Sequence, residues 1–170
     1  MNLLDLFFIL KNINDVDNID IYHNILLKID NIPYDIKERC YFKLMEDPLW
    51  AYNLIVDING VPDHIKRRAE EKCLEYPQWA YNLRIDVKDL PENMKRKAEE
   101  KACEDSCWAY YLRRDVKDLP EHIKKRAEEK CLESYYWAYC LIRNIKDLPE
   151  DIKRLAELKI CEDPDLAHIG

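Results

Sequence analysis

The sequence predicts an all-α fold, a right-handed α-solenoid of helix–turn–helix repeats that are each 29 residues long. Four tryptophans lie 29 residues apart and each is followed by Ala-Tyr: Trp50, Trp79, Trp108 and Trp137. Five prolines keep the same spacing: Pro33, Pro62, Pro91, Pro120 and Pro149. The chain has only two glycines and no threonine, whereas β-rich folds need glycine-rich turns and β-branched strands. A fixed period of this length is typical of a repeat array.

The N-terminal segment, residues 1–20, is expected to form a capping helix. Its apolar run has no basic leading segment and contains Asp5, so it does not have the pattern of a signal peptide. No stretch reaches the roughly 18 apolar residues of a membrane span, and no membrane contact is expected. Seven cysteines without a C-x-x-C pair indicate reduced thiols, and therefore a cytoplasmic, reducing location.

Five full repeats are predicted after this cap. They cover residues 21–49, 50–78, 79–107, 108–136 and 137–165, and residues 166–170 begin a truncated sixth. The long second helix of three repeats opens with Asp-Leu-Pro-Glu, as in 118–121, which predicts an aspartate cap completed by a glutamate capping box. The short first helix opens with Asp-Pro in two repeats, at Asp47-Pro48 and Asp163-Pro164, which predicts a cap of the same kind.

Each helix has one apolar stripe. In the long helix, Ile123, Ala127 and Cys131 lie at i, i+4 and i+8. In the short helix, the predicted buried face contains Trp108, Ala109, Leu112 and Val116. Neither helix can bury its stripe without a neighbouring repeat.

This organisation resembles the short two-helix repeats of HEAT-like proteins. The Trp-Ala-Tyr opening is similar to uncharacterised repeats of phage and archaeal proteins, and the resemblance covers residues 21–165. It implies a binding scaffold, since solenoids of this kind serve unrelated partners. It implies no activity and no particular functional residue.

No catalytic, cofactor-binding or metal-binding residue is predicted. The cysteines at the end of the long helix exchange with alanine, leucine and isoleucine along the repeats, which is typical of packing positions. Only Cys103 and Cys107 are spaced to share a ligand face, and they have no third ligand at a suitable spacing. His64 and His122 fall in an exposed first turn, and no phosphate-binding loop occurs. The chain is therefore not expected to be an enzyme, although an enzyme without a recognisable motif is the remaining alternative.

A strip of tyrosine and arginine on the short helices is the first candidate partner-binding surface. It consists of Tyr52, Tyr81, Tyr110, Tyr139, Arg84, Arg113, Arg114 and Arg143. These residue types are enriched at interface hot spots. The competing interpretation is that the tyrosines are half-buried between neighbouring helices, with only their hydroxyl groups in water.

Basic clusters on the long helices give a second candidate surface, which could bind a polyanion or nucleic acid. They are Lys66 to Arg68, Lys95 to Lys97, Lys124 to Arg126 and Lys153-Arg154. Glutamates at i,i+4 spacing interrupt this stripe, and the formal net charge is −7. Nucleic acid is therefore not the expected partner.

The C-terminal repeat provides a third candidate, an end contact. Leu155 and Leu158 replace the charged residues found at these positions in earlier repeats, and Leu166 follows in the truncated repeat. An apolar patch here predicts a contact with a partner, with a second copy in a homodimer, or with the tail of the chain.

Together these features favour a non-enzymatic scaffold or adaptor for protein–protein interaction. The resemblance extends this expectation to a viral or phage inhibitor that occludes a host protein. The identity of the protein partner is not encoded in any of these patterns.

Overall fold

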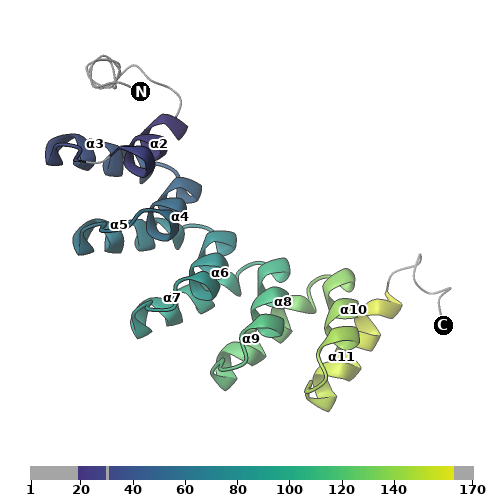
Figure 1. Cartoon of the computed structure of the whole chain (residues 1–170). Helices are drawn as coiled ribbons and strands as arrows, with labels where there is room; N and C mark the ends of the chain where they lie inside the picture. Colours follow the sequence, from purple (N-terminus) through teal and green to yellow (C-terminus); the bar gives the residue numbers. More distant parts are fainter. Residues whose placement is uncertain (1–18, 30, 163–170) are drawn as a thin grey trace. The chain divides into compact units, whose positions relative to one another are not determined.

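A computed structural model describes residues 19–29 and 31–162 of the chain, and this part is all-helical (Figure 1). It contains ten helices, and no strand occurs among the residues described. The chain divides into two compact units, residues 1–73 and residues 74–170. The all-α class predicted from the sequence is confirmed.

The first unit contains two helical hairpins. Its helices are α2 (Asp20–Lys28), α3 (Tyr34–Leu44), α4 (Pro48–Asp57) and α5 (Asp63–Cys73). Helix α2 packs on α3, and α4 packs on α5. The side chains of Tyr22, Ile25, Leu44, Leu54 and Ile65 are fully buried and form the interior of this unit.

The second unit contains three hairpins. Its helices are α6 (Pro77–Asp86), α7 (Glu92–Ala102), α8 (Ser106–Asp115), α9 (Glu121–Cys131), α10 (Tyr135–Asn144) and α11 (Glu150–Cys161). Each short helix packs on the long helix that follows it, and the short helices α6, α8 and α10 pack on one another in chain order (Figure 1). Equivalent residues of neighbouring hairpins can therefore be compared directly.

The predicted apolar faces are buried. Ile123, Ala127 and Cys131 of α9 are buried, as are Ala109 and Leu112 of α8. Trp108 differs from the prediction, because it is only half-buried and packs on the edge of this core. A large indole at the start of a short helix covers the core without being enclosed by it.

Of the caps predicted for the short helices, the one at Asp47 is confirmed, whereas Asp163 lies outside the described residues. The carboxylate of Asp47 accepts hydrogen bonds from the backbone N–H groups of Leu49 and Trp50, and Asp105 does the same at the start of α8. The capping box predicted for the long helices is wrong. Their N-caps are Pro91, Pro120 and Pro149, with no side-chain cap, because the helix begins one residue after the proline and leaves the aspartate too far upstream.

Both predicted end segments fall largely outside the described residues. Of the predicted capping helix at 1–20, the structure describes only Ile19 and Asp20, and Asp20 begins α2. The truncated repeat at 166–170, with Leu166, lies outside the described part entirely. Within 19–29 and 31–162, none of the helices has the length and apolar character needed to cross a bilayer.

Candidate functional site

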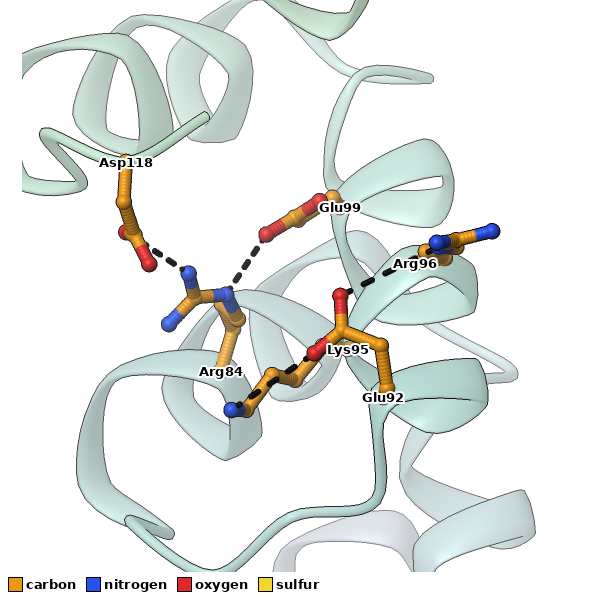
Figure 2. A network of polar contacts seen from close by, with 6 residues as sticks. All are labelled: Arg84, Glu92, Lys95, Arg96, Glu99 and Asp118. Atoms are coloured by element: carbon orange, nitrogen blue, oxygen red, sulfur yellow. Dashed lines mark hydrogen bonds and ion pairs between the residues drawn. The ribbon is translucent and has the colours of Figure 1, made fainter. Parts of the chain in front are cut away.

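A largely enclosed arginine connects neighbouring hairpins of the second unit. Arg84 of α6 donates from Nε to Glu99 of α7, at 2.6 Å, and from Nη2 to Asp118 of the next hairpin, at 3.0 Å (Figure 2). The side chain of Glu99 is 4% exposed, whereas that of Asp118 is 81% exposed. The guanidinium thus joins a buried carboxylate to an exposed one.

The same contact recurs one repeat later. Arg113 donates to Glu128 at 2.8 Å and contacts Asp147 at 3.0 Å. Burial alone would lower the pKa of Arg113, but the hydrogen bonds to both carboxylates outweigh it and raise that pKa. Burial raises the pKa of Glu128, with Arg113 opposing the shift, and the hydrogen bond from Arg113 lowers the pKa of Asp147. Asp118 and Asp147, predicted to be helix caps, are instead partners of the preceding hairpin.

Two tyrosines of the strip also contact the next hairpin. The Tyr81 hydroxyl donates to Asp115 at 2.6 Å, and Asn144 donates to the Tyr110 hydroxyl at 2.8 Å. In each pair the two residues are 34 residues apart in the sequence. The two tyrosines therefore occupy equivalent positions of consecutive repeats, and so do their partners. Tyr110 is only 4% exposed because α10 packs over it.

The structure therefore divides the predicted Tyr/Arg strip. Tyr81, Tyr110, Arg84 and Arg113 lie at contacts between hairpins. Tyr52, in the first unit, is half-buried. Arg114, Tyr139 and Arg143 remain exposed.

The exposed part of the strip continues into residues that the sequence did not single out. Tyr136, Tyr139 and Arg143 lie at i, i+3 and i+7 of α10, on one face of the helix. Tyr136 is 54% exposed and Tyr139 is 40% exposed. We call these three residues the α10 aromatic face. Tyr136 escaped the repeat pattern because Cys107 and Gln78 stand at its position in the preceding repeats.

Aromatic contacts join this face to α8. The ring of Tyr136 packs edge-on against Trp137, at 4.8 Å between centroids, and Trp137 packs on Tyr110 at 5.2 Å. Arg114 lies over the ring of Tyr111, at 4.6 Å from its centroid. The exposed Tyr136 ring therefore adjoins a layer of aromatic side chains formed by Trp137, Tyr110 and Tyr111.

The basic stripe of the long helices is partly paired within its own helices. Glu92 contacts both Lys95 and Arg96 at 3.9 Å (Figure 2). Lys124 contacts Glu121 at 3.5 Å, and Lys125 contacts Glu129 at 3.9 Å. Glu128, four residues after Lys124, is paired with Arg113 of α8. Such exposed pairs reduce the charge that the stripe offers to a polyanion.

The side chains that could support metal or acid–base chemistry are dispersed. In the described part of the chain, no three His, Cys, Asp or Glu side chains converge as metal ligands would. His64 and His122 are exposed, as expected. His23 differs: it is 9% exposed, lies 3.2 Å from Asp57, and packs against the Trp50 ring.

Leu155 and Leu158 of the predicted end contact are 50% and 57% exposed. Their equivalents in the preceding repeat, Arg126 and Glu129, are exposed as well, although another hairpin follows. These positions therefore lie on the lateral surface of the hairpin, and the two leucines form an apolar patch there.

Comparisons of this chain with protein-family models, with curated proteins and with solved structures found no match.

Proposed function

We propose that this chain is a non-enzymatic scaffold or adaptor that binds a protein partner through the α10 aromatic face. In this proposal the chain is a right-handed α-solenoid of 29-residue repeats and works in the cytoplasm. The recurrence of the arginine–carboxylate contacts and of the tyrosine contacts in consecutive hairpins supports the repeat architecture.

One observation carries the binding proposal: Tyr139 is 40% exposed, whereas its equivalent Tyr110 is 4% exposed beneath the next short helix. The same residue type, at the same position, is thus a packing surface for a helix in one repeat and accessible in the next. Tyr136 and Arg143 extend this surface with the side chains that dominate interface energetics. In this proposal a helix of the partner protein packs on Tyr139, as α10 packs on Tyr110.

An inhibitor of viral or phage origin that occludes a host protein would use such a face. This version of the proposal rests on the Trp-Ala-Tyr repeats described above.

The test is a comparison of captured proteins between the full chain and a Tyr136→Ser, Tyr139→Ser variant. Tyr34→Ser is the matched control, because Tyr34 is 57% exposed and lies in the first unit. We expect one captured protein to be lost in the double variant and retained in the control. A captured protein retained by all three chains, or none captured by the unaltered chain, would contradict the proposal.

A further inference from the structure

A basic cleft lies beside the α10 aromatic face. It has a volume of about 350 Å³ and is formed by the C-terminal end of α8, the loop after it, the start of α9, and the end of α10 with its following loop. Five basic residues line it, namely Arg113, Arg114, Lys117, Lys124 and Lys146, against one acidic residue, Asp147. In a chain with a formal net charge of −7, this is a local reversal of sign.

Part of this positive charge is not neutralised within the protein. Arg113 is paired with Glu128 and Asp147, and Arg114 with Asp115. Lys117 and Lys146 make no ion pair with any residue of the described chain. The ends of α8 and α10 add partial negative charge, about half an elementary charge each, which is less than the two lysines contribute.

The preceding repeat shows that the cleft is a local feature. At the equivalent positions, Ile85 replaces Arg114 and Asp115 replaces Asn144. The equivalent residues there include four basic and two acidic side chains, so two substitutions account for the stronger positive charge.

The cleft and the α10 aromatic face have no residue in common, but they are connected through Tyr110, whose ring packs on Trp137 beside Tyr136. Arg114 lines the cleft and lies over the rings of Tyr110 and Tyr111. Asn144 also lines the cleft and donates to the Tyr110 hydroxyl. A partner seated on the aromatic face would therefore have the cleft within reach of its adjoining residues.

We propose that this cleft binds the carboxylate side chains of an acidic segment of a protein partner. The proposal rests on the proposed function, since the aromatic face supplies the adjoining contact. The lining is polar apart from Ile145, so it offers little apolar enclosure for a small molecule, and the volume is near the lower end for such sites. A nucleic acid strand is less suitable, because the positive charge is confined to this cleft and the equivalent positions of the preceding repeat carry two acidic side chains, so the hairpins offer no continuous track for a phosphate chain.

The test is an NMR titration of the ¹⁵N-labelled full chain with acetylated hexaglutamate. We expect the amide signals of Lys117, Ile145 and Lys146 to shift in a saturable manner, and the affinity to fall as salt is raised. Lys146→Glu should weaken binding about tenfold, since it removes one charge contact and adds a repulsive one. Lys88→Glu, at the equivalent position two repeats earlier, is the matched control and should leave binding unchanged.

A second variant tests the cleft with substitutions that the fold already accommodates in the preceding repeat. Arg114→Ile with Asn144→Asp installs the residues of the preceding repeat, where Asp115 still bonds to Tyr81, so the hairpin contact has a working precedent. It should also weaken hexaglutamate binding. The proposal is overturned if the three signals do not shift, if Lys88→Glu is as damaging as Lys146→Glu, or if an oligothymidylate or inorganic phosphate binds more tightly than hexaglutamate.

Failure here is distinguishable from failure of the proposed function. If Tyr136 and Tyr139 are needed to capture a protein and Lys146→Glu does not change its capture, the scaffold proposal stands. The proposal that the cleft binds an acidic segment of that protein is then rejected.

Discussion

Arg113 donates from Nε to Glu128 of its own hairpin and contacts Asp147 of the next hairpin at 3.0 Å. The Arg113 side chain is 7% exposed and that of Glu128 is 3% exposed, so this is an ion pair removed from water. The contact of the same guanidinium with Asp147 fixes the position of one hairpin on the next.

Replacement of Arg113 by methionine should destabilise the chain by about 3 to 5 kcal/mol, because Glu128 would remain buried without a counter-charge. Urea unfolding followed by circular dichroism measures this. The double variant Arg113→Met, Glu128→Met should recover most of the loss, since both charges are then absent.

Arg143→Met is the control, because Arg143 is exposed and should change stability by less than about 0.5 kcal/mol. If Arg113→Met costs no more than this control, the buried pair does not have the stabilising role assigned to it.

The helix faces were predictable from the sequence because they depend on one period only. Ile123, Ala127 and Leu112 are buried where the 3.6-residue spacing places them. The contacts between hairpins were not predictable, since Arg113 and Asp147 are separated by 34 residues and no local rule links them. The capping rule predicts a helix cap at Asp147 because it considers only the nearest helix.

The candidate site shows the same limit. Tyr110 and Tyr139 occupy one repeat position, but one is 4% and the other 40% exposed. Tyr110 is covered by α10 of the next hairpin, which is a tertiary property. Sequence periodicity located the strip and could not say which of its members are accessible.

Trp108→Ala should cost about 2 to 3 kcal/mol, below the range for a fully enclosed tryptophan, because Trp108 is half-buried. Its ring still packs on Tyr81 and Tyr111, at 5.4 and 5.8 Å between centroids. Leu112→Ala, at a fully buried position, should cost at least as much despite the smaller side chain. The reverse order in urea unfolding would show that the indole is the main support of this core.

Lowering the pH should remove the contribution of Asp115 to the free energy of unfolding. Hydrogen bonds from Arg114 lower the pKa of Asp115, so the folded value lies below the unfolded value of about 3.9. The stabilisation is therefore present above about pH 4 and is lost as the pH falls through the folded pKa. Asp115→Asn should be less stable than the unaltered chain at pH 7, and the difference in urea midpoint should shrink progressively as the pH is lowered below about 4. A difference of equal size at both pH values would contradict this.

The cysteines should react with a thiol reagent in order of their burial. Burial raises the pKa of Cys73 and Cys103 to about 12, and that of Cys40 to about 11, so their reactive thiolates are scarce at pH 8. Cys161 is exposed and should react first. A native-state assay should give one fast thiol that Cys161→Ser abolishes, whereas a fast phase of four or more thiols would mean that the long-helix ends are open.

The exposed leucines of α11 should mediate self-association. Leu155 and Leu158 are 50% and 57% exposed, and they lie three residues apart, about 60° around the helix, so they form one patch. Leu155→Arg with Leu158→Glu restores the residues of the preceding repeat, Arg126 and Glu129, which are solvated there, and the variant should therefore fold. Light scattering over a range of concentrations should show dimers of the unaltered chain and monomers of this variant. Ile85→Arg, which removes a 39% exposed apolar residue elsewhere in the second unit, should leave the dimer intact. A monomer in every case would reject self-association through this patch, and a dimer that persists in the double variant would place the interface on another surface.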